Sequence, residues 1–274
     1  MTALSISRNF RVEPAAGSLG AYVHDFDLSL ALDEEQKDQV RSLILEHHVV
    51  CFRGQNITPA DHVRFTRMLG DFYIHPVVSG LEGHPEIIEV FGAAKLTESW
   101  HQDSTHSLRP PRLSILVART LPPYGNDTQF SNQHRAYDAL SEGLKAMLDG
   151  VGAVHTTAEP TKRALDRASV YGSVFEEATH PAVRTHPDTG RKALYVNAMY
   201  TRRFENMTVE ESRGLLEYLY AHCGRPDFTF RHRWQPGDVL IWDNASVQHA
   251  VIGDMPGGTE RYLHRTTTIG EEPA

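Results

Sequence analysis

The sequence predicts a mainly β fold with helices packed on its outside. Short runs of β-branched and aromatic residues recur along the chain, and turn residues separate them. A few segments instead show the apolar spacing of amphipathic helices. These segments do not alternate regularly with the strands, as they would in a doubly wound parallel sheet, and no glycine-rich nucleotide fingerprint or P-loop occurs. No internal repeat or linker divides the chain, so we expect a single domain over residues 1–274.

Four segments have the pattern of a helix: residues 33–47, residues 58–70, residues 132–148 and the segment that begins at residue 208. The first starts with a capping aspartate, Asp33. The second has Pro59 at its first position and ends at Gly70. Thr208 and Glu211 form a capping box at the start of the fourth.

Six segments are predicted as strands: residues 49–52, 86–91, 113–118, 192–200, 238–242 and 260–269. Cys51 lies within the first of them, in a run of apolar residues that is typical of a buried strand. The chain has one further cysteine, Cys223. Two cysteines in this context argue against both a disulfide framework and a thiolate metal site.

The composition excludes several classes of partner. The formal net charge is −8 with histidine neutral, so the sequence predicts no basic surface for a nucleic acid. No segment has the apolar length of a signal peptide or a membrane span, so we expect a cytoplasmic protein without a membrane partner. If the substrate is an anion, local charges of the binding site must attract it.

Histidine is unusually frequent, with 16 copies, and three of them precede a carboxylate by two positions. His84 and His186 have proline as the next residue and are more typical of turns and strand starts. His101 and Asp103 differ, because residues at positions i and i+2 of an extended segment point to the same side. Two histidines and one carboxylate form the facial triad of non-haem Fe(II) oxygenases. His249 is the best candidate for the third ligand, and its alternative interpretation is an ordinary loop histidine.

Arg261 and Arg265 lie four residues apart in the last predicted strand. With a period of two, both side chains point to the same face of the sheet. Two arginines that face a metal site would suit the recognition of carboxylates, because a guanidinium group matches a carboxylate with two parallel hydrogen bonds. The alternative is a salt-bridged outer face of an edge strand.

Several motifs, in this order, resemble the Fe(II)- and 2-oxoglutarate-dependent dioxygenases of the taurine dioxygenase and aryloxyalkanoate dioxygenase family. The motifs are WHQDST at 100–105, GNDT at 125–128, KALYVN at 192–197, WQPGDVLIWDN at 234–244, QH at 248–249 and RYLHRT at 261–266. The resemblance extends from about residue 10 to about residue 270. It implies a double-stranded β-helix, or jelly roll, with helices packed outside.

The resemblance also implies roles for individual residues. The positions of the iron ligands are His101, Asp103 and His249. Thr128 and Arg261 match the residues that hold the distal carboxylate of 2-oxoglutarate. The positions that match residues around the substrate are His75, Arg265 and Tyr200.

Three positions of the substrate pocket depart from the pattern of taurine dioxygenase. Val78 stands where that enzyme has tyrosine, His106 stands where it has phenylalanine, and Thr97 aligns near its pocket asparagine. Sites that are built around specific polar partners discriminate strongly when those partners change. We therefore expect the cofactor site to be intact and taurine not to be the best substrate.

The resemblance implies an enzyme that uses Fe(II), 2-oxoglutarate and O2 to hydroxylate a small organic anion, with succinate and CO2 as co-products. The anion is a carboxylate, a sulfonate or a sulfate ester, including aryloxyalkanoates, and a bond from the hydroxylated carbon to a heteroatom can then break. Asp103 argues against a halogenase, which has a small residue at that position. The alternatives are a non-catalytic jelly-roll protein that binds anions and a zinc hydrolase with the same three ligands, but neither explains Arg261 together with Thr128. Members of the family are usually homo-dimers or homo-tetramers, so we also expect an oligomer.

Overall fold

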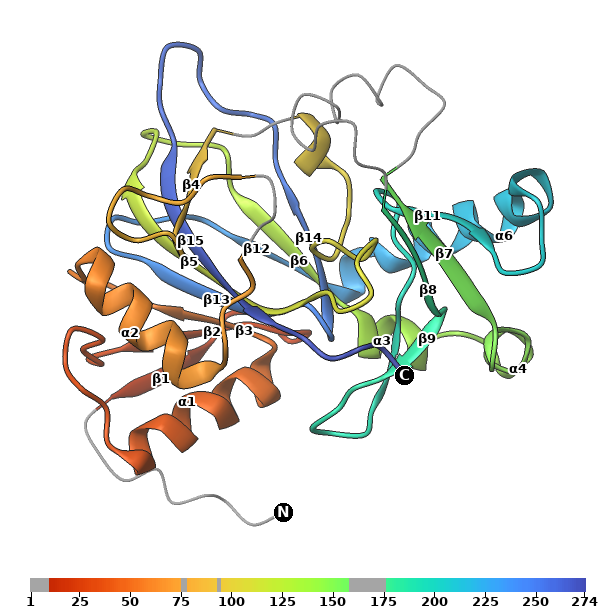
Figure 1. The fold of residues 1–274 in the computed structure, drawn as a ribbon, viewed down its shortest axis with the longest axis horizontal. Coiled ribbons are helices and arrows are strands. Elements are labelled where there is room, and N and C mark those ends of the chain that lie inside the picture. Colours follow the sequence, from red (N-terminus) through yellow and green to blue (C-terminus); the bar gives the residue numbers. More distant parts are fainter. Residues whose placement is uncertain (1–9, 75–77, 93–94, 158–175) are drawn as a thin grey trace.

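A seven-stranded sheet forms the centre of the computed structural model, which describes residues 10–74, 78–92, 95–157 and 176–274 (Figure 1). The order of its strands is β1 (Arg11–Pro14), β2 (Ala21–His24), β3 (Val49–Phe52), β13 (Val239–Asp243), β5 (Pro111–Thr120), β15 (Tyr262–Ile269) and β4 (Ile88–Phe91). All neighbouring strands are antiparallel except β2 and β3. The expectation of a mainly β fold with flanking helices is confirmed.

A smaller antiparallel sheet packs against one face of the large sheet. Its strands are β12 (Thr229–His232), β6 (Thr128–Asn132) and β14 (Val247–Val251), with β6 in the middle. Phe130 and Val247 of the small sheet share a buried apolar cluster with Leu240, Trp242 and Leu263 of the large sheet. The site described below lies between these two sheets.

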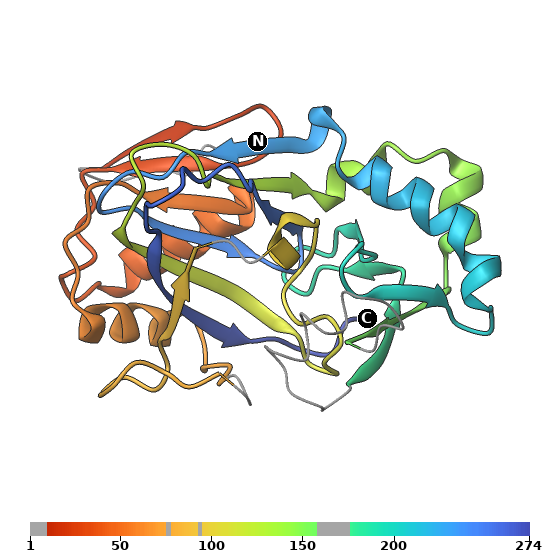
Figure 2. The ribbon, with the colours of Figure 1, turned by 90° about the horizontal axis from the view of Figure 1, so that it is seen from above.

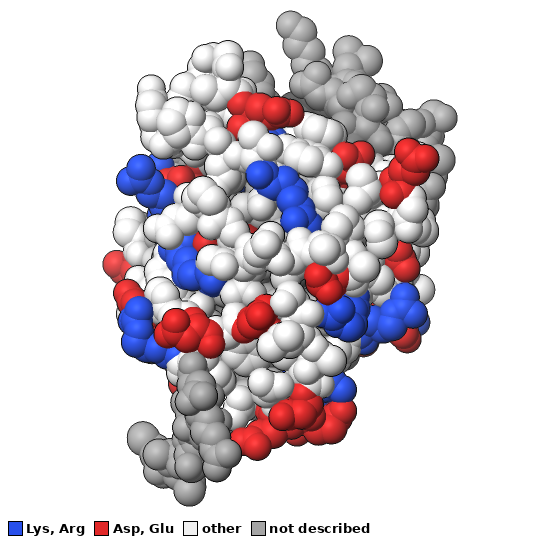
Figure 3. Space-filling model, turned by 90° about the vertical axis from the view of Figure 1, so that its left-hand side faces the viewer, with Lys and Arg blue, Asp and Glu red and all other residues white. Residues whose placement is uncertain are grey.

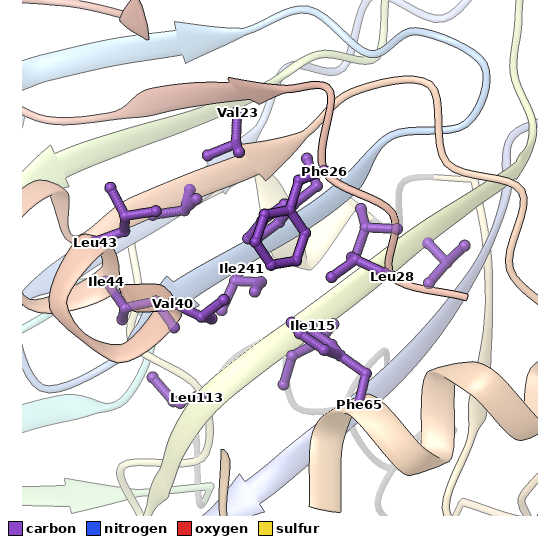
Figure 4. Packing of buried hydrophobic residues seen from close by; sticks show 14 of the residues in the cluster. Val23, Phe26, Leu28, Val40, Leu43, Ile44, Phe65, Leu113, Ile115 and Ile241 are labelled. Carbon is purple, nitrogen blue, oxygen red and sulfur yellow. The ribbon is translucent and has the colours of Figure 1, made fainter. Parts of the chain in front are cut away.

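Two helices cover the other face of the large sheet: α1 (Glu34–His47) and α2 (Pro59–Leu69). Val40 and Ile44 of α1 and Phe65 of α2 pack on Ile115 and Ile241 (Figure 4). Successive residues of a strand point to opposite faces. The central strands are therefore buried on both sides, which explains why they have continuous apolar sequences.

The remaining elements lie at the opposite end of the molecule from α1 and α2 (Figures 1 and 2). The strands there are β11 (Thr201–Phe204), β7 (Gly152–Thr156), β8 (Glu177–Pro181), β9 (Val183–Thr185) and β10 (Lys192–Leu194). The helices there are α3 (Gln133–Asp138), α4 (Glu142–Leu148) and α6 (Val209–Cys223). Leu148, Leu194, Phe204 and Leu219 join these elements in a separate apolar cluster. Two short 3₁₀ helices, η1 (Lys95–Glu98) and η2 (Pro226–Phe228), complete the described elements.

Most predicted elements are confirmed, and two are wrong in part. The capping boxes of α1, α2 and α6 begin at Asp33, Thr58 and Thr208. The helix predicted over residues 132–148 is broken into α3 and α4, because the Ser141 hydroxyl accepts a hydrogen bond from Leu144 N and starts a new helix. The strand predicted over residues 192–200 ends at Leu194, because the side chain of Asn197 accepts a hydrogen bond from Tyr200 N and turns the chain.

The surface shows no strongly basic region on the face drawn in Figure 3, where acidic and basic side chains lie intermixed. Among the helices in the described ranges, none has the length and apolar character needed to cross a membrane.

Candidate metal and anion site

The backbone brings two histidines together. His249 lies in β14, and His101 forms an antiparallel bridge with it. His101 N donates to His249 O at 3.0 Å, and His249 N donates to His101 O at 2.8 Å. The centroids of the two imidazole rings are 4.1 Å apart. The sheet itself therefore places both rings on one wall of the site.

Asp103 completes the group that was predicted to bind a metal. One ligand atom from each of His101, Asp103 and His249 lies within 4.8 Å of the others, and all three residues are buried. Asp103 Oδ1 is 3.8 Å from His249 Nε2. The extended conformation expected for residues 101–103 does not continue to Asp103, because the chain turns there and Ser104 has a φ of 46°.

The three side chains have protonation states that suit a metal. The pKa of His249 falls to about 3, because burial disfavours the charged ring and His101 lies beside it. Burial acts to raise the pKa of Asp103, but the charge of Arg265 and then the two histidines hold it well below its usual range. The Nδ1 atom of His101 lies 2.8 Å from the carbonyl of Ser99, which can only accept, so the lone pair of this ring is on Nε2. Two imidazole nitrogens and one carboxylate fit Fe(II) or another divalent transition metal.

Arg261 is a buried cation, with 2% of its surface exposed. Its Nη2 and Nη1 atoms lie 3.4 Å from Thr128 Oγ1 and from the carbonyl of Gly92, and its guanidinium carbon lies 5.3 Å from the centroid of the Trp234 ring. Burial lowers the pKa of Arg261 to about 10, which still leaves the group charged at neutral pH.

The described residues supply no carboxylate within ion-pair distance of Arg261. Asp127 is close enough to influence its pKa, but this carboxylate pairs with Arg231 at 2.6 Å. The Nε atom of Arg261 also has no hydrogen-bond partner. A buried charge without a partner is costly, so the site is arranged for an anionic ligand.

A cavity of about 410 Å³ connects the metal-binding group with Arg261. Besides these residues, the predicted site residues that line it are Thr128, Arg265, Val78, Thr97 and Tyr200. Most of the remaining wall is apolar and was not predicted: Ile88, Val90, Phe91, Leu116, Met199, Trp242 and Val251. Pockets of this size hold small organic ligands.

Arg265 faces the same cavity as Arg261, as the strand period predicts. Its Nη1 atom lies 3.5 Å from Asp103 Oδ1, and 25% of its side chain is exposed. Ile88 and Leu116 are its neighbours on the adjacent strands. Because β15 lies between β5 and β4, the alternative of an outer face on an edge strand is wrong.

Two predicted substrate residues are not on the described cavity wall. His106 lies behind Tyr200, with ring centroids 4.9 Å apart, and its Nε2 atom is 3.5 Å from Glu176. His75 lies outside the described residues. His186, which was interpreted as structural, is buried and pairs with Asp243 at 2.9 Å.

Cys51, His232 and Asp238 form a second buried group with the spacing of metal ligands. Arg53 Nη1 lies 2.6 Å from Asp238 Oδ2, so a positive charge already balances this carboxylate. Burial also raises the pKa of the Cys51 thiol well above its usual range, so this group offers no thiolate ligand. The group around His101 is therefore the better candidate for a metal site.

The comparisons with known proteins agree with this geometry. A family model described as "Taurine catabolism dioxygenase TauD, TfdA family" matches residues 11–267. An alpha-ketoglutarate-dependent sulfate ester dioxygenase from Pseudomonas putida is 33% identical, and the match covers 96% of this chain and 90% of that protein. An alkylsulfatase from Acinetobacter baylyi is 32% identical, with coverage of 97% and 86%. The crystal structure of a taurine dioxygenase from Burkholderia xenovorans has a TM-score of 0.86 and 36% identity, with coverage of 97% and 91%.

The unpaired charge of Arg261 can be tested through protein stability. We expect Arg261→Met to leave the free energy of unfolding of the ligand-free protein unchanged within about 1 kcal/mol, or to raise it, because a buried ion is replaced by an apolar side chain. Arg53→Met is the matched control: it removes the partner of buried Asp238 and should lower this free energy by about 3–5 kcal/mol. Urea unfolding of both variants gives the comparison. A loss for Arg261→Met as large as that for Arg53→Met would show that protein groups already compensate the charge.

Proposed function

The chain belongs to the TauD/TfdA family of alpha-ketoglutarate-dependent dioxygenases, and on that premise we propose that it is an Fe(II)-dependent hydroxylase of a small organic anion. In this proposal His101, Asp103 and His249 bind the iron. A metal held by only three protein ligands would keep coordination positions for 2-oxoglutarate and O2. The two facing antiparallel sheets support a double-stranded β-helix as the fold.

The buried guanidinium of Arg261, which has no carboxylate partner among the described residues, is the observation that carries the proposal. It lies across the same cavity from the three metal ligands, so a dicarboxylate can reach both. We assign the distal carboxylate of 2-oxoglutarate to Arg261 and to the Thr128 hydroxyl. Trp234 supports this arrangement, because its indole N–H donates to Thr128 Oγ1 at 3.1 Å and directs the hydroxyl hydrogen away from the indole. A metal site alone, as in a zinc hydrolase, would leave Arg261 without a role.

We assign the substrate anion to Arg265. Ile88 and Leu116 flank this arginine, and Val78 and Val90 extend the apolar wall. Asp103 and Glu89 are the carboxylates among the described lining residues, and Glu89 already accepts a hydrogen bond from the Tyr262 hydroxyl. The ammonium group of taurine would find few carboxylates to balance its charge here. An apolar tail would instead pack against the apolar wall.

A sulfate ester or sulfonate with an apolar group fits these walls. Two relatives named for sulfate esters and alkyl sulfates support this choice over a carboxylate. When bound, Fe(II) and 2-oxoglutarate supply the oxidation, in which O2 is consumed and succinate, CO2 and a hydroxylated substrate are formed. Hydroxylation of the carbon that bears the sulfate gives an adduct that breaks down to an aldehyde and inorganic sulfate.

The residues of the chain orient the reactants for this reaction. Arg261 and Arg265 point into one cavity and hold two different anions, so that the substrate carbon next to its anionic group lies near the metal ligands. The separation between Arg261, which directly precedes β15, and Arg265 within it sets the spacing between co-substrate and substrate. The apolar side chains of the wall exclude water from the reacting carbon.

Succinate formation from 2-oxoglutarate tests this function directly. With Fe(II), air and a linear alkyl sulfate, we expect succinate and aldehyde in equal amounts, and we expect Asp103→Ala or removal of iron by a chelator to reduce both to background. Asp188→Ala is the matched control, because exposed Asp188 belongs to the other His-x-Asp pattern, and this variant should retain activity. Full activity of Asp103→Ala, or turnover with zinc and without 2-oxoglutarate, would contradict the proposal.

Arg265→Ala separates the two anion sites. We expect the KM for the alkyl sulfate to rise about 10- to 100-fold, because a charge-assisted hydrogen bond contributes about 1.5–3 kcal/mol. The KM for 2-oxoglutarate should change less than about threefold, since Arg261 is retained. Steady-state kinetics with each reactant varied in turn gives both constants. If both KM values rise equally, or if taurine is the better substrate of the wild-type enzyme, the assignment of Arg265 is wrong.

A further inference from the structure

We propose that Ser114 and Asn244 are positioning residues, which hold the carboxylate of Asp103 so that only its Oδ1 atom is presented to the metal. This inference rests on the proposed iron site, and it concerns residues that contact neither substrate nor metal. Ser114 lies in the middle of β5, and Asn244 directly follows β13. Both residues belong to the large sheet or its edge, whereas the two histidines are held by β14 of the small sheet.

Arg265 Nη1 donates to Asp103 Oδ1 at 3.5 Å, and four further hydrogen bonds link Asp103 to Ser114, Asn244 and Trp242. The Ser114 hydroxyl donates to Asp103 Oδ2 at 2.8 Å, and Asn244 Nδ2 donates to Ser114 Oγ at 3.0 Å. Asn244 Oδ1 accepts from Asp103 N at 3.2 Å and from the indole N–H of Trp242 at 3.0 Å. The four residues joined by these further bonds are buried. The first three of these further bonds form a closed ring that begins and ends at Asp103.

The donors fix the direction of every bond in this ring. A backbone N–H and an indole N–H can only donate, so the Asn244 atom that they share must be the amide oxygen. The amide nitrogen therefore faces Ser114 and donates to it. Since Ser114 Oγ accepts this bond, its single hydrogen is directed to Asp103 Oδ2. The ring thus requires Asp103 Oδ2 to be an acceptor and occupies one of the two carboxylate oxygens.

The other oxygen, Oδ1, is the one that points to the histidines, at 3.8 Å from His249 Nε2. A carboxylate held in this way binds a metal through one atom and does not rotate to bind through two. Ligand orientation by such partners commonly contributes a factor of about 10–100 to metal affinity. The ring also fixes the Asp103 turn to the large sheet, so a bound metal joins the two sheets.

Titration calorimetry of the ligand-free enzyme with Mn(II) tests the ring without any turnover. We expect Ser114→Ala to weaken Mn(II) binding about 10- to 100-fold. Asn244→Asp keeps the volume but removes the donor to Ser114, and it should weaken binding as well. Ser212→Ala is the matched control: Ser212 is also buried, and its hydroxyl likewise donates and accepts, to Thr208 O at 2.8 Å and from Phe204 N at 2.9 Å, but it lies in α6.

The outcomes distinguish this inference from the proposed function. If the wild-type protein does not bind Mn(II), the metal site itself is wrong. If wild type and Ser212→Ala bind equally and both Ser114→Ala and Asn244→Asp are folded and bind as tightly, the positioning role is wrong and the metal site stands. Weaker binding by either folded variant, with Ser212→Ala unchanged, supports the ring. Circular dichroism of each variant establishes that it is folded.

Discussion

The buried positive charge of Arg261 is the constraint on which the site depends. A guanidinium group with 2% of its surface exposed and no carboxylate partner among the described residues costs free energy that packing alone does not return. The protein reduces this cost with one hydroxyl, one carbonyl and the face of an indole ring, but it leaves room for an anion. His101, Asp103 and His249 line the same cavity, so an anion bound to Arg261 would share the cavity with the proposed metal.

The architecture explains why these groups meet. The two histidines are fixed by backbone hydrogen bonds between β14 and the segment before the turn, and Asp103 is fixed by side chains of the large sheet. Arg265 lies in β15 and Arg261 directly precedes it, and the neighbours of β15 on each side are strands of the same sheet. The helices α1 and α2 cover the opposite face and contribute only to the core. The two histidines, Asp103 and the two arginines are thus held by different parts of the two packed sheets. This arrangement suits a site that must keep its geometry without its cofactors.

The strongest local patterns of the sequence predicted the helices well. Features that depend on pairing between strands far apart in the sequence could not be predicted in this way. Capping boxes and apolar spacing located α1, α2 and α6, but the strands of the small sheet were missed because they are short and carry site residues such as Thr128 and His249 at buried positions. The sequence motifs predicted the grouping of His101, Asp103 and His249, which the structure brings together. The apolar wall could not be predicted, because Ile88 and Leu116 reach Arg265 through strand register, which no local pattern reports. His106 was expected in the pocket, but its ring packs on that of Tyr200, and His106 is not among the described lining residues.

The central claim is that Arg261 binds the distal carboxylate of 2-oxoglutarate next to a bound metal. The most direct measurement is the affinity of the Mn(II)-loaded protein for 2-oxoglutarate, by titration calorimetry, in wild type and in Arg261→Met. Removing one partner of a desolvated, hydrogen-bonded charge pair costs about 2–5 kcal/mol, so the variant should bind about 30-fold to several thousand-fold more weakly while its Mn(II) affinity is retained. Equal affinity of both proteins for 2-oxoglutarate would contradict the account.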